Sequence, residues 1–497
     1  MRRRLSGPST PLFVPLSLAA LLIAASILAS CAGKALGGNQ GGSGNGGSAA
    51  SPVTPTISWP TPSPIANTTP LTSTQLDATA SVPGTFVYTP AAGTVLTAGT
   101  HALSVGFTPA NPAGYNDASA SVTITINPAL TSPSAYVYVS GSANASTTEV
   151  YAFRAASDGT LTPVAGSPFS TIGGLQATNG KLLFGGNGID IDSYSVAADG
   201  TFQQVASINA QALNSKDLNG GACGGPTALF PDHTGTVLYD LDFYSDCANN
   251  AYQLFSVDRS SGSLSYIGVT SVTTPIFEVP LSFLGNNQFA YGASCYHWYQ
   301  EIFGFTRNRD GSLTSLGVNP TLGPPMPVSQ AGQMYCPYLT ATDPTNHLAV
   351  PVQPLDNSSL QPVGPYQLAT YTADSSGNLT TTSTYSNMPT TSVTTNSSLG
   401  SLTNISMSPS GQLLAVAGTQ GLQLFHFNAA NPITPYTSAL ITGQVDQIFW
   451  DNHDHLYAIS QSAGKLFVLT VTPTSNSQAP GSPYTITSPA NLVVLSQ

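Results

Sequence analysis

The chain has 497 residues, of which only 7% are charged, and its formal net charge at pH 7 is -11. An acidic chain of this kind does not attract nucleic acid or anionic lipid through its charge, so we expect no nucleic-acid partner. Long helices need more Ala, Glu, Lys and Leu in a 3.6-residue rhythm, and the composition instead predicts an all-β protein.

Residues 1–30 have the organisation of a secretory signal peptide. Three Arg residues follow Met1, and an uncharged apolar stretch extends from residue 11 to residue 29. The Leu-Ala-Ser-Cys sequence ending at Cys31 resembles the lipobox of bacterial lipoproteins, which implies acyl chains such as palmitate on Cys31. Two or more such chains hold a protein on a membrane without a spanning helix. A retained transmembrane helix and an ordinary signal peptide are the alternatives.

Residues 31–55 are rich in Gly, Ser and Pro, which predicts a flexible tether beyond the lipid. Ala32 follows Cys31 where Asp would retain a lipoprotein in the inner membrane, so resemblance to bacterial lipoprotein sorting favours the outer membrane. No later segment is apolar for long enough to cross a membrane. We expect a cell-envelope protein, periplasmic or surface-exposed, that contacts the membrane through the lipid on Cys31.

Residues 56–128 contain short runs of alternating apolar and polar residues with turn residues between them. This pattern predicts a small antiparallel β-sandwich. The runs at 81–90, 99–105 and 115–126 resemble the short bacterial Ig-like repeats of surface proteins. The resemblance implies a spacer or adhesive module without catalytic residues.

An internal repeat fills residues 132–497. Its most regular element is an aromatic-rich strand, and in five of the seven copies a Gly turn such as Asp158-Gly159 follows. Gly supplies the positive φ that a tight reversal demands. The seven strands lie at residues 150–153, 193–196, 254–257, 302–305, 368–371, 424–427 and 466–469.

Paired apolar runs around another turn complete each repeat, so each repeat supplies four strands. Seven four-stranded units predict a seven-bladed β-propeller, in which each twisted sheet packs on its neighbours around a channel. The first repeat lacks its innermost strand, whereas the C-terminal run 491–495 matches one. We therefore expect 491–495 to close the ring by pairing with 135–140, which removes two open edges.

The repeat region resembles the YVTN and lactonase-type (6-phosphogluconolactonase-like) seven-bladed propellers. The likeness rests on the phrase at 151–169, its Gly-Ser-Pro-Tyr echo at 481–484, and the Ser-Pro-Ser-Gly turn at 408–414. The resemblance implies lactone hydrolysis, for which relatives rely on His, Glu and Arg in the channel. This sequence places no Arg there, which disfavours that activity.

Four Cys residues remain after Cys31, as expected for two disulfides in an oxidising compartment. All four fall in or beside the long connections between strands that we expect on one face of the propeller. Three pairings are possible, and we favour Cys223 with Cys247 and Cys295 with Cys336, because each pair joins connections of one blade or of adjacent blades. Redox or metal roles are the less favoured alternative.

Aromatic and polar side chains accompany these Cys residues and form a candidate ligand-binding rim. Packing within the connections is the alternative explanation for them. The candidates are Tyr244, Tyr296, His297, Trp298, Tyr299, Tyr335 and Tyr338.

The catalytic candidates are Glu278 and His297, which we expect on the same face. No metal-spaced cluster, Ser nucleophile motif or phosphate loop is present, so we expect no metal and no cofactor. We favour an envelope-anchored, non-catalytic propeller that binds a carbohydrate, a peptide or a protein. A hydrolase of sugar lactones and a subunit of an envelope assembly complex are the two alternatives.

Overall fold

A computed structural model gives the fold, and its chain separates into two compact units, residues 1–128 and 129–497. The structure describes residues 51–127 and 133–497, with gaps at 68, 145–146, 172, 218–227, 243–249, 273–278, 297–298, 318–324 and 396–399. The predicted signal peptide, Cys31 and most of the tether lie outside the described residues.

The N-terminal module, residues 51–127, is a small β-sandwich of two sheets. A four-stranded sheet has the order β2-β6-β5-β4, and β1 pairs with β3. Inward-facing side chains of β5 and β6, such as Leu103 and Ile124, pack on Leu71 and Leu76. The strands are β1 (Ile57–Ser58), β2 (Ile65–Ala66), β3 (Thr79–Ala80), β4 (Gly84–Thr89), β5 (Gly99–Pro109) and β6 (Ala118–Asn127).

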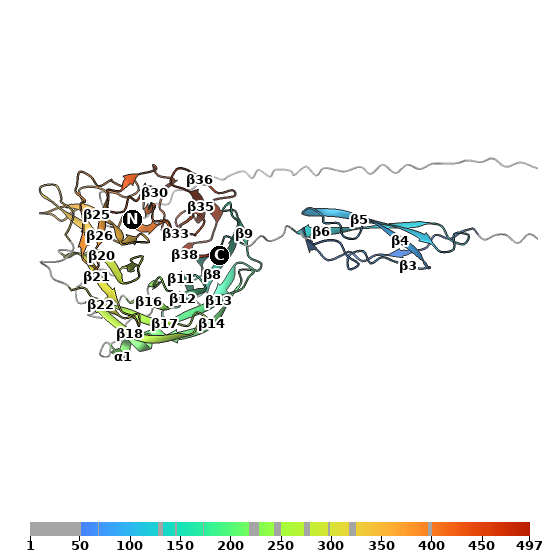
Figure 1. Ribbon diagram of the computed structural model, residues 1–497, viewed down its shortest axis with the longest axis horizontal. Coiled ribbons are helices and arrows are strands. Elements are labelled where there is room, and N and C mark those ends of the chain that lie inside the picture. Colours follow the sequence, from blue (N-terminus) through green and yellow to red (C-terminus); the bar gives the residue numbers. More distant parts are fainter. Residues whose placement is uncertain are drawn as a thin grey trace, which may run out of the picture. The chain divides into compact units, whose positions relative to one another are not determined.

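The second unit consists of seven antiparallel sheets that stand in a ring, as predicted (Figure 1). We number these blades along the chain and name the strands of each blade inner, second, third and outer. Blade 1 contains β38 (Pro489–Ser496), β7 (Ala135–Asn144), β8 (Thr147–Ala155), β9 (Leu161–Pro163) and β10 (Phe169–Thr171). Blade 2 contains β11 (Gly174–Thr178), β12 (Leu182–Gly186), β13 (Asp190–Val196) and β14 (Phe202–Asn209), and α1 (Ala210–Asp217) follows it.

The other five blades repeat this order. Blade 3 contains β15 (Ala228–Pro231), β16 (Val237–Asp242), β17 (Asn250–Val257) and β18 (Leu264–Val272). Blade 4 contains β19 (Ser282–Phe283), β20 (Phe289–Tyr296), β21 (Tyr299–Arg307) and β22 (Leu313–Ser315). Blade 5 contains β23 (Gln333–Pro337), β24 (Ala341–Thr342), β25 (His347–Asp356), β26 (Gln367–Ala373) and β27 (Leu379–Thr380).

Blades 6 and 7 complete the ring. Blade 6 contains β28 (Leu402–Met407), β29 (Leu413–Gly418), β30 (Gly421–His426), β31 (Thr434–Pro435) and β32 (Ile441–Thr442). Blade 7 contains β33 (Gln447–Trp450), β34 (His455–Ser460), β35 (Lys465–Val471), β36 (Asn476–Gln478) and β37 (Tyr484–Thr485). All seven aromatic-rich runs of the sequence lie in third strands or extend one residue beyond them.

The C-terminal strand closes the ring, as predicted. β38 pairs antiparallel with β7, and this pairing sets Leu492 opposite Val139 and Leu495 opposite Tyr136. Residues 492–495 are at most 4% exposed, because their side chains enter the cores on both sides of the sheet. The first and last strands of the propeller therefore belong to one blade.

Gly turns between third and outer strands join neighbouring blades. The predicted turn glycines have positive φ, for example 91° at Gly311 and 84° at Gly377. Tyr239 of blade 3 donates a hydrogen bond to the carbonyl of Gly311 in blade 4 (2.7 Å), and Tyr291 of blade 4 does the same to Gly377 of blade 5 (2.7 Å). The turns thus serve as acceptors for the preceding blade as well as reversals of the chain.

Four outer strands are interrupted, a feature that the repeat pattern did not predict. In blade 1 a bulge separates β9 from β10, and the Ser167 hydroxyl accepts the N–H of Ala152 in the third strand (2.9 Å). In blade 7 the Ser482 hydroxyl accepts the N–H of Val468 in the same way (2.9 Å). Ser383 and Thr437 take this role in blades 5 and 6. The repeated Gly-Ser-Pro phrase therefore supplies a hydroxyl where an outer-strand carbonyl is missing.

Candidate functional site

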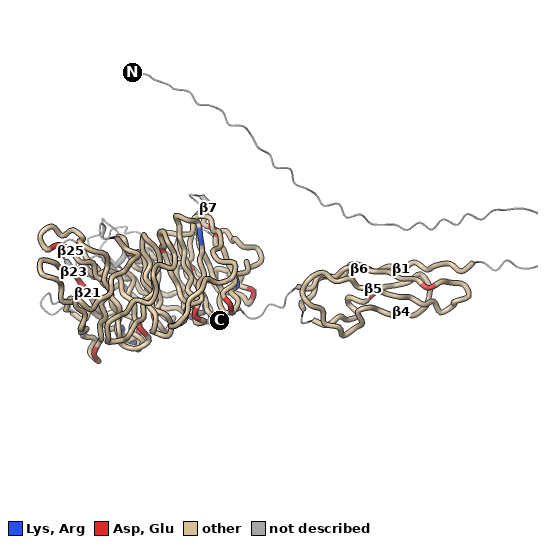
Figure 2. Tube along the Cα trace, turned by 90° about the horizontal axis from the view of Figure 1, so that it is seen from above, with Lys and Arg blue, Asp and Glu red and all other residues tan. Residues whose placement is uncertain are grey.

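The two faces of the propeller differ in how their strands connect. Short hairpin turns between inner and second strands, and between third and outer strands, form one face, which we call the turn face. The connections between second and third strands, some of them long, and the connections between blades form the other, which we call the loop face. Figure 2 shows the propeller edge-on, with many acidic segments along the side that carries the C-terminus, which is the turn face.

The Asp residues of the turn face form hydrogen bonds within their own turns. Five Asp residues each accept the backbone N–H two residues further on, and hydrogen bonds from side chains and backbone of the same turn lower the pKa of each carboxyl. They are Asp158, Asp199, Asp258, Asp310 and Asp374. All four Arg residues of the propeller (Arg154, Arg259, Arg307 and Arg309) also lie at or near these turns.

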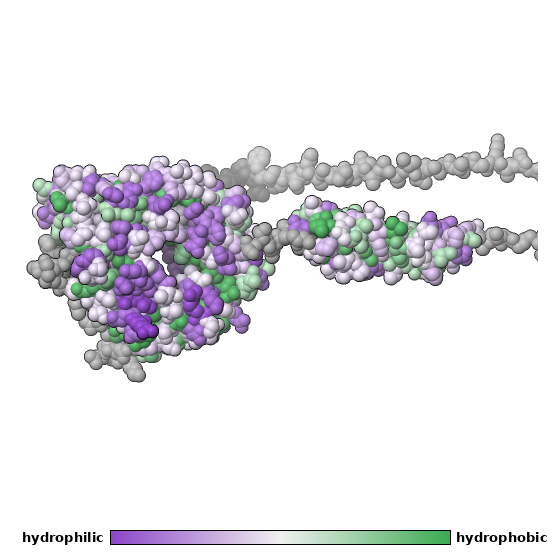
Figure 3. Space-filling model, in the orientation of Figure 1, coloured by the Kyte–Doolittle hydropathy of each residue, from purple (hydrophilic) through white to green (hydrophobic). Residues whose placement is uncertain are grey.

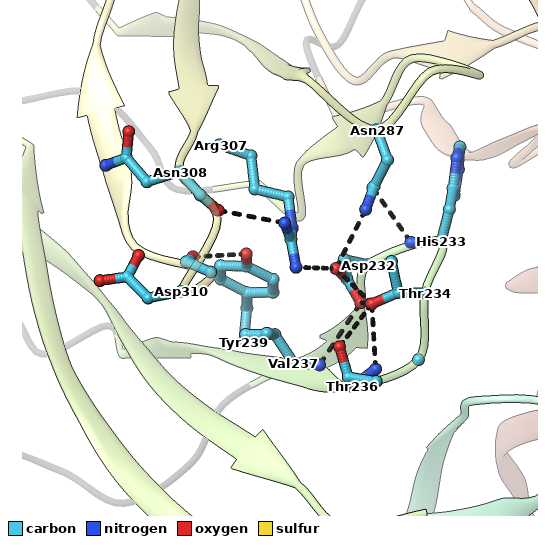
Figure 4. Close-up of polar contacts among 12 residues, drawn as sticks. Asp232, His233, Thr234, Thr236, Val237, Tyr239, Asn287, Arg307, Asn308 and Asp310 are labelled. Atoms are coloured by element: carbon cyan, nitrogen blue, oxygen red, sulfur yellow. Dashed lines mark hydrogen bonds and ion pairs between the residues drawn. The ribbon is translucent and has the colours of Figure 1, made fainter.

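An ion pair on this face joins blades 3 and 4 (Figure 4). Arg307 Nη2 lies 2.6 Å from Asp232 Oδ2, with the two side chains 10% and 0% exposed. The same carboxylate accepts hydrogen bonds from Asn287 (3.1 Å) and from the Thr234 hydroxyl (2.8 Å). Such a buried pair holds two blades together and leaves this guanidinium unavailable to a ligand, although its Nε has no hydrogen-bond partner.

The turn face also contains a cavity of about 260 Å³ between the inner turns of blades 3 to 6. Figure 3 shows a hollow near the centre of the ring. His233 lies at the rim with its ring tilted by 60° against that of Phe283 (centroids 6.2 Å apart), and burial lowers the pKa of the imidazole. The lining consists of His233, Gly285, Thr342, Asp343, Pro344, Met407, Ser408 and Pro409. None of these residues was a sequence candidate, because their turns do not lie on the face with long connections.

The loop face carries the predicted disulfide between Cys295 and Cys336. Cys295 is near the end of β20 in blade 4, and Cys336 is in β23 of blade 5, so the bond fastens neighbouring blades. The backbone N–H of Leu339 adds a hydrogen bond to the carbonyl of Ala293 across the same boundary (3.1 Å). Cys223 and Cys247 lie outside the described residues.

Two of the predicted rim residues lie deeper than expected, since Tyr335 is buried and Tyr338 is half-buried. Tyr335 is 2% exposed, packs in the core between blades 4 and 5, and donates its hydroxyl to Gln367 Oε1 (2.7 Å). Burial raises its pKa to about 12. Tyr338 packs against two cores, and burial raises its pKa as well. Both rings support the loop face from inside and present little surface to a ligand.

The other predicted site residues are only partly described. Tyr296 and Tyr299 are the last residue of β20 and the first of β21, and their backbones are opposite each other in the register of these two strands. Tyr244, Glu278, His297 and Trp298 lie outside the described residues, so the structure does not test their grouping.

Neither a metal centre nor a membrane span is found in the described parts of the chain. No group of three or more His, Cys, Asp or Glu side chains there is arranged to hold a metal ion. No described helix has the length and apolar content that crossing a bilayer requires.

Comparisons with known proteins identify structural neighbours only. No family model matches the chain, and no curated protein matches its sequence. A proposed 6-phosphogluconolactonase of Bacteroides fragilis is 11% identical with a TM-score of 0.52, and covers 74% of this chain and 99% of its own. A Lactobacillus plantarum protein is 12% identical with a TM-score of 0.51, covering 73% and 99%.

The Pseudomonas aeruginosa periplasmic gluconolactonase is 14% identical with a TM-score of 0.50, and covers 73% of this chain and 99% of its own. At such identities the likeness establishes the fold and not the activity. The second unit of the chain therefore has the seven-bladed propeller fold of 6-phosphogluconolactonase-like and gluconolactonase proteins.

Proposed function

We propose that this chain is a non-catalytic binding protein of the cell envelope, anchored through Cys31, whose propeller binds a neutral carbohydrate, a peptide or a protein on its loop face. The observation that carries the proposal is the Cys295–Cys336 disulfide, which fastens blades 4 and 5 beside the long connections. Long ordered connections on a rigid scaffold commonly carry binding function.

The positions of the cations favour a ligand without negative charge. Recognition of phosphate or carboxylate usually employs Arg, whose planar fork matches these groups. In this propeller the Arg residues lie toward the turn face, and Arg307 is already paired with Asp232. Lys465 begins β35 on the loop face, where its Nζ donates to the Thr485 hydroxyl (2.8 Å).

Binding of the full chain to glycan and peptide arrays, followed by titration of any hit, tests the proposal. Val363 lies in the connection between β25 and β26 on the loop face and is 46% exposed. We expect Val363→Asp to weaken binding at least about tenfold, which corresponds to about 1.4 kcal/mol. Val205→Asp is a matched control, because Val205 is 42% exposed in the outer strand β14. Absence of any glycan or peptide ligand, or equal binding by wild type and Val363→Asp, would contradict the proposal.

Lactone hydrolysis is the second candidate, favoured by the names of the structural neighbours and by the cavity beside His233. A neutral imidazole can accept a proton from the water that attacks a lactone carbonyl. A panel of sugar lactones tests it with the full chain and with His233→Gln, Glu278→Gln and His297→Gln. Hydrolysis that one of these variants abolishes would replace the binding proposal.

A further inference from the structure

The N-terminal module has a sheet edge that no described strand covers. β4 pairs with β5 on one side and is the last strand in the order β2-β6-β5-β4. Figure 2 shows β6, β5 and β4 in this order, with β4 outermost. A strand in this position presents free N–H and C=O groups, which are a template for pairing with another chain.

The register with β5 determines which backbone groups point to the open edge. Ala110 donates its N–H to the carbonyl of Pro83 (2.9 Å), immediately before the first paired residues of β4. Because bonded and non-bonded pairs alternate in an antiparallel sheet, Thr85 and Val87 bond to β5. The N–H and C=O groups of Phe86 and Tyr88 therefore point away from β5.

The sequence of β4 is nearly the same in both directions. Residues 85–89 are Thr-Phe-Val-Tyr-Thr. Two antiparallel copies with Val87 opposite itself would set Phe86 of each copy against Tyr88 of the other. In this register the outward-facing backbone groups of the two copies meet, so each Phe86–Tyr88 pair can exchange both of its N–H···O bonds. Such an arrangement is self-complementary, as a two-fold interface must be.

The side chains along β4 favour pairing with a second copy of the strand and do not obstruct it. Natural sheet edges are commonly protected by charge, Pro or a bulge, and β4 has none of these between Gly84 and Thr89. Val87 is 70% exposed, and an aromatic pair directly across two strands contributes up to about 1 kcal/mol. Residues 51–127 contain only two charged residues, Asp77 and Asp117, so two modules repel each other little.

We propose that the chain forms a two-fold dimer in which the β4 strands of two N-terminal modules pair antiparallel about Val87. The two four-stranded sheets then become one continuous sheet. Such a dimer presents two propellers at once, which increases the avidity for any ligand that repeats on a surface.

Sedimentation velocity of the full chain tests the dimer. Val87→Lys places two like charges directly opposite each other at the two-fold axis, and we expect the dimer dissociation constant to rise at least about tenfold. Ala102→Lys is the matched control, because Ala102 is exposed on the same sheet face but lies in β5, which has β4 on one side and β6 on the other. We expect the control to dimerise like wild type. A monomeric wild type, or a Val87→Lys variant that dimerises as wild type does, would overturn the proposal.

Cross-linking tests the register without weakening the interface. Residues opposite each other in a non-hydrogen-bonded pair have Cβ atoms close enough for a disulfide. Under mild oxidant we expect Val87→Cys to form a covalent dimer that reductant reverses. Ala102→Cys, exposed on the same face but in the interior strand β5, should not form one. Equal cross-linking of the two variants, or none for Val87→Cys, would contradict the β4 register.

Discussion

The inner edge of the propeller and the β4 edge of the N-terminal module differ in whether the chain itself covers them. In the propeller, inner-strand N–H groups are capped by the neighbouring blade: Ser140 accepts the N–H of Leu175 (2.8 Å), and Gln447 accepts that of Leu492 (2.8 Å). The strand that would leave the ring open is supplied by the C-terminus itself. In the module, β4 keeps its outer edge free of any described strand. The inner edge of the propeller is thus covered from within the chain, whereas the edge of β4 has no described partner strand.

Removal of the closing strand should have the largest effect, because it uncovers the inner edge of β7 and takes four buried side chains out of the core. Residues 492–495 are nearly fully buried, and burying each such side chain contributes roughly 1.5–3 kcal/mol. Their loss is comparable with the whole stability of a typical domain, about 5–15 kcal/mol. We expect deletion of residues 489–497 to abolish the cooperative unfolding transition of the propeller in calorimetry. Deletion of the exposed Gln497 alone should preserve it. A truncated chain with the wild-type transition would show that ring closure is dispensable.

Asp232→Ala should cause the next largest loss, at the boundary between blades 3 and 4. It leaves the Arg307 guanidinium buried without its carboxylate, and breaking a buried pair in this way costs about 3–5 kcal/mol. Chemical denaturation measures the change in the free energy of unfolding. Arg309→Ala is the control, because Arg309 is exposed and its removal should cost less than about 0.5 kcal/mol. Equal stability of the two variants would mean that the ion pair does not hold the blades together.

Replacing both members of the Cys295–Cys336 disulfide by Ala tests how the loop face is held. A disulfide that closes a loop of this kind stabilises a protein by about 2–4 kcal/mol. We expect a loss in that range and weaker binding of any loop-face ligand, measured by denaturation and titration. Reductant should destabilise wild type by breaking this bond, whereas the double variant has no such bond to lose. Unchanged binding by a folded double variant would mean that the ligand site does not depend on the disulfide.

Tyr291→Phe should have a smaller effect at the boundary between blades 4 and 5. The variant keeps the ring but leaves the carbonyl of Gly377 without its donor, which costs about 1–3 kcal/mol when that group stays buried. Thermal denaturation measures it. The second strand of blade 2 is the natural comparison, because it contains the fully buried Phe184, an aromatic ring without a hydroxyl to donate. If Tyr291→Phe is as stable as wild type, these bonds are incidental to blade packing.

The pH dependence of the turn face should be the smallest effect. Hydrogen bonds from the hydroxyl and N–H of Ser260 lower the pKa of Asp258 to about 2. Since this pKa is depressed, the stabilisation by the turn is complete above the ordinary carboxyl value of about 3.9 and is lost as the pH falls toward 2. Carboxyl NMR titration should find this low pKa, and Ser260→Ala should raise it. An ordinary pKa for Asp258 in wild type would mean that these hydrogen bonds do not persist in solution.

Much of the architecture was predictable because its signals are local. Aromatic third strands, glycines with positive φ and the unpaired apolar run at 491–495 each mark a structural position in the sequence itself. The pairing of Cys295 with Cys336 followed from assigning their connections to neighbouring blades. These features determine the number of blades and the way the ring closes.

The candidate site was less predictable because it depends on which side chains neighbouring blades cover. Tyr335 lies only one residue from Cys336 and was expected on the rim, yet blades 4 and 5 enclose its ring. The cavity beside His233 forms where turns of four blades converge, and no single repeat encodes it. The outer-strand interruptions did have a signal, since the Gly-Ser-Pro phrase recurs at 166–168 and 481–483.

Hydrogen exchange of the full chain, measured across a range of protein concentrations, tests the contrast between closed ring and open edge most directly. We predict that the amides of β38 and β7 exchange only upon global unfolding at every concentration. The amides of Phe86 and Tyr88 should exchange rapidly at low concentration and become protected as the concentration rises. Rapid exchange in β38, or protection of Phe86 and Tyr88 that does not depend on concentration, would contradict this contrast.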